Sequence, residues 1–455
     1  MAIETINPAT GQLIHSYAEH SRPEVSRVLD DVSGAFASWR DTEFVTRSAL
    51  FEGMARLLRE RQESLAALMA AEVGKPLREG RAEVGKCVWV CEYYAAEAEG
   101  FLAPQAVATD ASKSYVTFRP LGPVLGIMPW NFPLWQVIRY AAPALMAGNV
   151  AVLKHAPSAT GCSLTIEQLF KDAEFPANVF RSLVLENARV AEVIADERIA
   201  AVTLTGSTRA GRAVASQSGA VLKKTVLELG GSDPYLVLED ADLQSTVEAC
   251  ATSRLINCGQ SCIAAKRIVI VDSVREEFER RFVERMSAAQ MGDPTDETVD
   301  IGPLARHDLR DNLHRQVVES VEAGAKLLLG GEIPDGPGAF YPPTVLTDVK
   351  VGMPAFDEEL FGPVAAIVRV ADEEEGITLA NSTMYGLGAA VFTADVARGE
   401  RIAAQRLDAG ACFVNEFVRS DPRLPFGGIK QSGYGRELSG FGIREFVNVK
   451  TVYVD

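Results

Sequence analysis

Residues 199–215 read IAAVTLTGSTRAGRAVA, where an apolar segment leads through Gly206 into a helix-forming one. Near-continuous apolar runs are typical of strands buried on both faces of a sheet. At a strand-to-helix turn of this kind, free backbone N–H groups and the helix dipole suit a pyrophosphate. The spacing of Gly206 and Gly211 matches neither G-x-G-x-x-G nor a P-loop, so the turn alone fits an ordinary tight connection equally well.

The same alternation of element types continues on both sides of this turn. Extended segments are expected within 115–128, broken at Gly122-Pro123, and at 149–155 and 179–185, with a helix over 160–172. After Gly230-Gly231 the pattern starts again, with strands at 235–238, 267–271, 364–370 and 389–393 and helices from Leu243 to Asn257 and on to about Gln290. Residues 23–72 carry a helical period. Strand–helix–strand alternation predicts a doubly wound parallel sheet followed by a second α/β domain.

Bulk composition narrows the classes of ligand. The chain has 455 residues, which favours two or three domains, and its 45 Lys and Arg against 61 Asp and Glu give a net charge of −16. Such an acidic protein disfavours nucleic acid and anionic membranes as partners, so a small molecule is the expected ligand. Seven scattered cysteines, an N-terminus unlike a signal peptide and no run of 18 apolar residues together predict a cytoplasmic protein.

Two cysteines four residues apart stand in INCGQSCIAA (256–265). They could form a metal clip, a redox switch, core filling, or one nucleophile beside a bystander. The five histidines show no metal-ligand spacing, so no metal site is expected. Cys258 reads as core filling at a helix end, whereas Cys262 follows Gly-Gln-Ser in a loop that a substrate can approach, and a thiolate is a strong nucleophile.

A carboxylate and an amide are further candidates. Glu228 in LELGGSDP (227–234) has an apolar setting that would raise its pKa toward that of a general base, although a lone buried glutamate is otherwise usually structural. Asn131 in MPWNFPLWQVIR (128–139) lies in a turn between two prolines, where its amide could donate to an oxyanion or simply form an Asx turn.

Taken together, six motifs resemble the aldehyde dehydrogenase superfamily in their order along essentially the whole chain. They are PWNFP (129–133), TGS (205–207), LELGG (227–231), GQSC (259–262), EELFGPV (358–364) and PFGGIKQSGYGREL (425–438). Within that superfamily, KHAP (154–157), GQSCIAAKR and SDPRLPFGG most resemble bacterial succinate-semialdehyde dehydrogenases.

The resemblance implies an α/β fold with a Rossmann-type cofactor domain, a second α/β catalytic domain and a small oligomerisation element. The dinucleotide-binding domain would comprise residues 1–103 and 122–230, and the catalytic domain residues 231–424. The oligomerisation element would comprise residues 104–121 and 440–455. The strands at 115–120 and 447–454 would pair across subunits and give a homodimer or homotetramer.

The resemblance also implies roles for the candidate residues. Cys262 would attack the aldehyde, Asn131 would hold the oxyanion, and Glu228 would activate the water that hydrolyses the thioester, with Glu437 as a proton relay. The cofactor, NAD or NADP, would contact Ile127, Trp130, Lys154, Pro157, Gly206, Ser207, Glu359 and Phe361. Many NAD-dependent members carry a glutamate where this chain has Pro157, so NADP remains as open as NAD.

The expected substrate is succinate semialdehyde, and its surroundings would include Trp135, Arg139, Ser261 and Ser420. Arg139 lies one helical turn after Trp135 and would bind the far carboxylate, unless it merely pairs with a surface carboxylate. Alternatives are another small aldehyde or semialdehyde, transfer of the acyl group to coenzyme A, and a catalytically silent protein. The presence of Glu228 favours hydrolysis over transfer to coenzyme A. A catalytically silent protein is not expected, because the chain has Cys262, Asn131 and Glu228 together.

Overall fold

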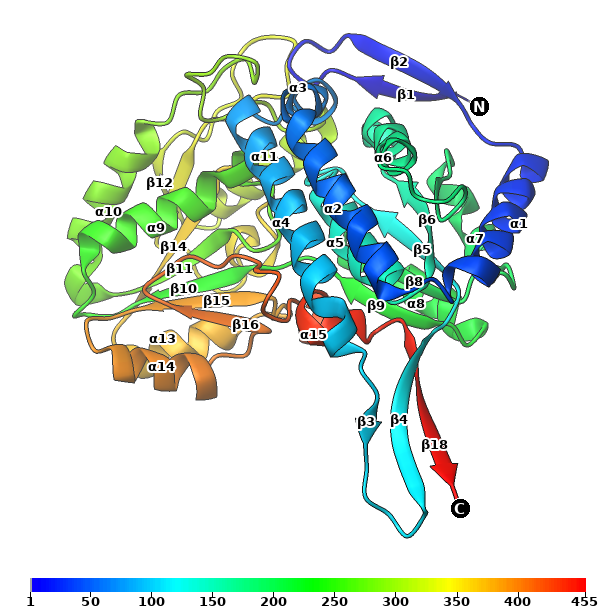
Figure 1. Cartoon of the computed structure of the whole chain (residues 1–455). Coiled ribbons are helices and arrows are strands. Elements are labelled where there is room, and N and C mark those ends of the chain that lie inside the picture. The colour runs from blue at the N-terminus through cyan, green and yellow to red at the C-terminus, as the bar shows by residue number, and fades with distance from the viewer. Residues whose placement is uncertain (1) are drawn as a thin grey trace.

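Two open β-sheets with packed helices form the body of the protein, and a three-stranded arm extends from it (Figure 1). The computed structural model describes residues 2–455. The strands of both large sheets run parallel except at one edge of each, which confirms the predicted α/β class.

The six-stranded sheet has the order β17-β9-β8-β5-β6-β7. Its strands are β5 (Pro123–Met128), β6 (Val150–His155), β7 (Phe180–Ser182), β8 (Ala201–Thr205), β9 (Lys224–Glu228) and the antiparallel β17 (Gly433–Tyr434). The chain places β6 and β7 on one side of β5 and then returns to place β8 and β9 on the other. Ligands bind such sheets at the carboxyl ends of the strands where this order reverses, here between β5 and β8.

The seven-stranded sheet has the order β12-β13-β14-β11-β10-β15-β16. Its strands are the antiparallel β12 (Lys326–Leu329), β13 (Thr344–Thr347), β14 (Val364–Val370), β11 (Ala265–Val271), β10 (Asp233–Val237), β15 (Gly388–Phe392) and β16 (Ala411–Val414). The predicted strands at 235–238, 267–271, 364–370 and 389–393 all lie in it, with ends that differ by two residues at most.

Helices pack against both sheets. Those of the first half of the chain are α1 (Arg22–Trp39), α2 (Phe44–Glu60), α3 (Gln62–Val73), α4 (Leu77–Phe101), α5 (Trp135–Met146), α6 (Thr160–Asp172), α7 (Val190–Ala195) and α8 (Thr208–Ala220). Those of the second half are α9 (Leu243–Leu255), α10 (Asp272–Ser287), α11 (His307–Glu322), α12 (Pro354–Asp357), α13 (Glu373–Asn381), α14 (Val396–Gln405) and α15 (Ser439–Ile443). Of residues 2–455, none forms a helix with the length and apolar composition needed to cross a lipid bilayer.

The helical prediction was right for some segments and incomplete for others. Residues 160–172 form α6 as expected, and the helix predicted from Leu243 ends at Leu255, where a short 3₁₀ turn follows. The helical period over 23–72 corresponds to the three helices α1, α2 and α3. Helix α4 was not predicted, although it packs on α2, α3 and α5 at the centre of the molecule (Figure 1).

The arm is an antiparallel sheet of the order β18-β4-β3, made of β3 (Gln105–Ala106), β4 (Lys113–Pro120) and β18 (Val447–Val454). It places the C-terminus at the tip of the arm, away from the N-terminal hairpin of β1 (Ala2–Ile6) and β2 (Leu13–Ala18) (Figure 1). The strands predicted at 115–120 and 447–454 therefore pair with each other within one chain.

Candidate active site

Four segments that carry predicted site residues leave the six-stranded sheet at the same edge. Asn131 follows β5, Pro157 follows β6, Ser207 follows β8, and Glu228 is the last residue of β9. Because these four strands are parallel, their carboxyl ends meet at one edge. The turn from β8 into α8 has the predicted form, and the Ser207 side chain caps α8 by accepting a hydrogen bond from the Ala210 N–H.

The loop that carries Cys262 begins with an unusual backbone turn. Asn257, Cys258 and Gly259 are consecutive residues in the left-handed region, with φ of 55°, 55° and 74°. At Gly259 a Cβ would lie 2.3 Å from the Gly362 carbonyl, so only glycine allows this approach. The glycine of GQSC thus packs on the glycine of EELFGPV, and two motifs about 100 residues apart meet.

Polar contacts hold this turn in place. The Asn257 N–H donates to the Glu79 carboxylate of α4, and the fully buried Arg254 donates to the Gly259 carbonyl. The Asn257 side-chain amide donates to the Asn131 carbonyl at 2.7 Å. The Cys262 loop is therefore tied to both α4 and the segment after β5.

Cys258 and Cys262 have different surroundings. Cys258 is fully buried, and its sulfur accepts a hydrogen bond from the Gly302 N–H at 3.2 Å. Cys262 is half-buried and lines a cavity. The surrounding protein raises the pKa of the Cys262 thiol to about 12 by excluding water, although the cations of Lys266 and Arg139 lower it. At neutral pH the thiol of the free protein is protonated.

The Asn131 amide lies within hydrogen-bond reach of the Cys262 loop. Its Nδ2 donates to the Gln260 carbonyl at 3.0 Å, and its Oδ1 accepts from the Gln136 side chain at 3.2 Å. Asn131 is buried. These bonds fix the orientation of an amide that has a second N–H to offer.

Glu228 and Glu437 are two buried carboxyl groups near Arg139. Burial and then the charge of Glu437 raise the pKa of Glu228 well above its usual range, whereas Arg139 lowers it. Arg139 forms an ion pair with Glu437 and donates to the Thr205 hydroxyl at 3.3 Å. Neither Glu228 carboxyl oxygen has a hydrogen-bond partner within residues 2–455. A protonatable carboxyl with free hydrogen-bonding capacity suits exchange of a proton with water.

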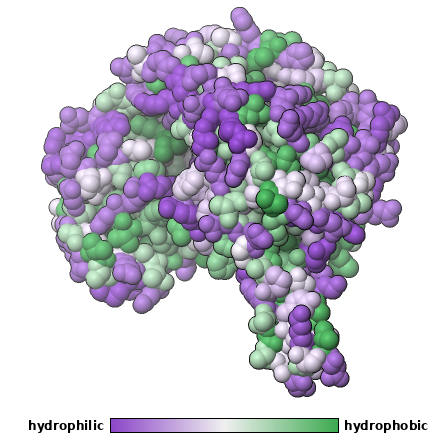
Figure 2. Space-filling model, viewed as in Figure 1, coloured by the Kyte–Doolittle hydropathy of each residue, from purple (hydrophilic) through white to green (hydrophobic). Residues whose placement is uncertain are grey.

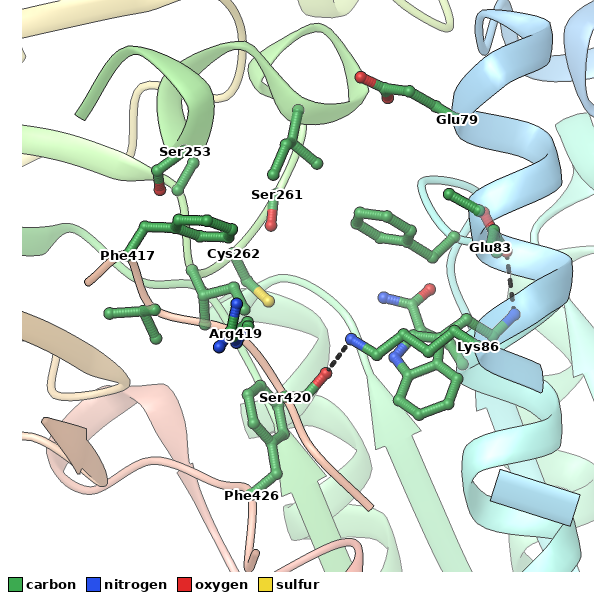
Figure 3. Close-up of a pocket in the computed structure, with 18 of the residues that line it drawn as sticks. Glu79, Glu83, Lys86, Ser253, Ser261, Cys262, Phe417, Arg419, Ser420 and Phe426 are labelled. Atoms are coloured by element: carbon green, nitrogen blue, oxygen red, sulfur yellow. Dashed lines mark hydrogen bonds between the residues drawn. The ribbon is translucent and has the colours of Figure 1, made fainter. Parts of the chain in front are cut away.

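A cavity of about 250 Å³ opens in front of Cys262 (Figure 3). Five of its lining residues are among those predicted from the sequence: Trp135, Arg139, Ser261, Cys262 and Ser420. Sequence reasoning missed the cavity face formed by α4, with Glu79, Glu83 and Lys86. These three follow the i, i+4, i+7 spacing of one helix face, a signal that would have been readable had α4 been predicted.

Glu83 shapes the opposite wall. Its carboxylate accepts hydrogen bonds from the N–H groups of Leu134 at 2.8 Å and Trp135 at 2.9 Å, and it forms a buried ion pair with Lys75. An anion at a helix N-terminus is stabilising. Glu83 therefore fixes the start of α5 and, with it, the segment that carries Asn131.

The predicted cofactor residues lie around the β5/β8 edge and the adjoining β14 loop. The Trp130 and Phe361 rings meet edge-on with centroids 5.8 Å apart. Glu359 accepts from the Gly231 N–H at 3.0 Å and lies 3.3 Å from the Lys266 ammonium. A Cβ on Gly230 would lie 2.5 Å from the Glu359 carboxylate, which explains the glycine there.

The remaining cofactor candidates fit the binding of a dinucleotide. Ile127 lies in β5 and Gly206 ends the turn before α8, where a Cβ would meet no atom closer than 3.6 Å. Lys154, near the carboxyl end of β6, donates to the Asn187 side chain, and burial lowers its pKa to about 8. Beside Pro157, the Ser158 hydroxyl is buried without a hydrogen-bond partner among the described residues. An open turn, an ammonium and an unused hydroxyl at one sheet edge suit phosphate and ribose groups.

No metal centre accompanies this site in the described part of the chain. Within residues 2–455 no three His, Cys, Asp or Glu side chains gather closely enough to hold a metal ion.

Comparisons with known proteins identify the family of the chain. Residues 1–452 match the model of the aldehyde dehydrogenase family. A probable succinate-semialdehyde dehydrogenase [NADP(+)] of Synechocystis sp. is 48% identical over 454 residues, covering 100% of both chains. A succinate semialdehyde dehydrogenase [NAD(P)+] of Escherichia coli is 47% identical over 451 residues, covering 99% of this chain and 97% of that protein. The crystal structure of succinic semialdehyde dehydrogenase from Streptococcus pyogenes with NADP+ superimposes with a TM-score of 0.97 at 35% identity, covering 100% of both chains.

Proposed function

Because the chain belongs to the aldehyde dehydrogenase family, we propose that it oxidises succinate semialdehyde to succinate with NAD or NADP. The observation that carries this proposal is one cavity lined by the Cys262 thiol together with the cations of Lys86 and Arg139. A nucleophile faces the reacting carbon of an aldehyde, and cations suit an anionic far end. Relatives named for this substrate support the same choice.

In the first half of the reaction, Cys262 forms the covalent bond. Its sulfur adds to the aldehyde carbon as the thiol releases its proton to water, and the carbonyl electron pair moves onto the oxygen. The free N–H of the Asn131 amide and the backbone N–H of Cys262 donate to that oxyanion. A bound nicotinamide would supply the hydride acceptor, and loss of hydride from the substrate carbon would leave a thioester on Cys262.

In the second half, Glu228 takes a proton from water, which attacks the thioester and releases the carboxylate product. The raised pKa of Glu228 fits a group that must take up and release this proton. Glu437 would pass the proton on: its charge raises the pKa of Glu228, and an ion pair with Arg139 holds its carboxylate.

Both coenzymes are accepted in this proposal. Trp130, Ile127 and Phe361 would line the nicotinamide end, Glu359 its ribose, and Gly206 with Ser207 the pyrophosphate. Lys154 would contact the adenosine ribose or its 2′-phosphate, and Pro157 presents no carboxylate to repel that phosphate. The relatives carry NADP(+) and NAD(P)+ in their names.

The proposal divides the chain into three parts. The coenzyme would be bound by residues 1–103 and 122–230, and Cys262 would belong to a catalytic domain of residues 231–424. Subunits would be joined by residues 104–121 and 440–455. A cytoplasmic location remains a prediction.

Initial rates with succinate semialdehyde, butanal and other small aldehydes test the proposal, each with NAD and with NADP. We expect reduced-nicotinamide absorbance to rise fastest with succinate semialdehyde. Adding coenzyme A should leave the product a free carboxylate, because Glu228 directs the acyl group to water. The proposed function would be contradicted by equal rates for all aldehydes or by an acyl-coenzyme A product.

A further inference from the structure

The cavity in front of Cys262 contains one cation that no carboxylate neutralises. Three cationic side chains of residues 2–455 line it: Lys86, Arg139 and Arg419. Arg139 is paired with Glu437, and Arg419 lies 3.5 Å from Glu416. The described part of the chain offers Lys86 no carboxylate partner within ion-pair distance.

Lys86 reaches the cavity from α4, on the side opposite the Cys262 loop. Figure 3 shows its side chain extending toward Ser420, with the Cys262 thiol pointing into the same space. Its ammonium donates to the Ser420 hydroxyl at 2.6 Å and lies 4.6 Å from the centre of the Trp135 ring. Lys86 is half-buried, and its ammonium has only one neutral acceptor and a ring as partners. An anionic ligand would offset the cost of burying this charge.

Ser420 completes the geometry of an anion site. Since its oxygen accepts from Lys86, its own hydrogen is free to be donated, and the ammonium keeps two further N–H groups. Arg139, by contrast, has its charge neutralised by Glu437 and lies 4.9 Å from the Phe426 ring centre. Lys86 and Ser420 thus present converging donors to one carboxylate, whereas Arg139 already has a partner.

We propose that Lys86, with Ser420, binds the far carboxylate of the aldehyde substrate and selects ω-carboxylated aldehydes over neutral ones. This rests on the proposed function and adds a residue to it: Lys86 carries most of the discrimination, because Glu437 offsets part of the charge of Arg139.

The titration of Lys86 gives the proposal a signature in pH. Burial, and then the charge of Arg139 on α5, lower the pKa of Lys86 to about 8. Cys87 and Glu83 on α4 and Asp421 beside Ser420 act in the opposite direction. Because the ammonium is charged below this pKa and neutral above it, KM for an anionic substrate should rise as the pH passes 8. KM for a neutral aldehyde should not.

The test replaces Lys86 and compares two four-carbon substrates. Lys86→Met should lower kcat/KM for succinate semialdehyde by roughly 10- to 100-fold, the effect of losing a charge-assisted hydrogen bond. Butanal, which lacks the carboxylate, should be oxidised at nearly the wild-type rate and so reports that the variant is folded. Lys171→Met removes an equal charge from the exposed side of α6 and should change neither rate.

Lys86→Arg separates charge from structure. It should keep part of the preference for succinate semialdehyde and lose the rise of KM above pH 8, since arginine stays charged. Lys86→Met could lower kcat/KM equally for both substrates, and the pH dependence of KM in the wild-type enzyme is then decisive. If KM for succinate semialdehyde changes with pH no more than KM for butanal does, the proposal is overturned. An unchanged preference in Lys86→Met overturns it too, while the proposed function stands as long as the wild-type enzyme prefers succinate semialdehyde.

Discussion

At the scale of single residues, the two cysteines of INCGQSC have the same chemistry and opposite surroundings. Cys258 faces the core and uses its sulfur as a hydrogen-bond acceptor, whereas Cys262 faces the cavity. Reactivity requires access as well as a thiolate. The positions of the two cysteines in the fold therefore agree with the prediction that Cys258 fills the core and Cys262 is accessible.

Cys262→Ala should abolish aldehyde oxidation, and Cys258→Ala should retain measurable turnover. The Cys258 variant loses one buried hydrogen bond and a little volume, so we expect a loss of about 1–2 kcal/mol in the free energy of unfolding. Initial rates and denaturant unfolding measure the two effects. Peptide mapping that finds the acyl group on Cys258 would refute the assignment.

Glu228→Gln should separate the two halves of the reaction. The amide cannot take a proton from water, so the variant should release a burst of reduced coenzyme, roughly one per site, and then stall at the thioester. Rapid-mixing absorbance gives the burst amplitude, and wild type serves as the control. Absence of the burst would instead assign Glu228 to activation of Cys262.

The residues of the site could be predicted in part. Cys262, Trp135, Arg139, Ser261 and Ser420 lie in motifs, and the fold brings them to one cavity. The partner of Arg139 could not be foreseen, because Glu437 is nearly 300 positions away in the chain. Lys86 lies in no motif. Its proposed role depends on the absence of a carboxylate partner among the described residues, which only the fold reveals.

At the scale of elements, buried strands were predicted better than helices. Strand β14 has the expected bounds because a strand buried on both faces is a continuous apolar run. Helix α4 was missed, since it packs on three other helices and its apolar stripe is interrupted by cavity-lining polar residues. The left-handed turn at 257–259 was not foreseen either, because two of its residues are not glycine.

Gly259→Ala should destabilise the Cys262 loop strongly. The added Cβ would require both a left-handed alanine and a 2.3 Å approach to the Gly362 backbone, which neither partner can relieve. We expect a loss of about 2 kcal/mol or more in the free energy of unfolding, together with a fall in kcat. Thermal unfolding and initial rates measure both.

Gly85→Ala is the matched control for this change. Gly85 lies on α4 with no atom within 4 Å of a built Cβ, so alanine should stabilise the helix by about 0.5–1 kcal/mol. Equal behaviour of the two variants would mean that the turn tolerates a side chain and does not constrain Cys262.

At the scale of the whole molecule, the arm of β3, β4 and β18 is a projecting sheet with apolar side chains exposed to solvent. Figure 2 shows it standing clear of the body with hydrophobic residues on its surface. Val107, Val449, Tyr453 and Val454 are all exposed on it, and β18 pairs with β4 on one side only. An open strand edge beside exposed apolar side chains favours association with another copy.

We therefore expect the protein to be a homodimer or homotetramer whose contacts include the arm. Light scattering after size exclusion should give a multiple of the 49.0 kDa chain mass. Val449→Glu should shift that mass toward the monomer, since an interface would bury an unpaired carboxylate at a cost of several kcal/mol. Val396→Glu is the control: both valines are 60% exposed, but Val396 lies on α14, so its variant should keep the wild-type mass. A wild-type protein that is monomeric with full activity would contradict the assembly, and equal dissociation of both variants would show that the arm is not its site.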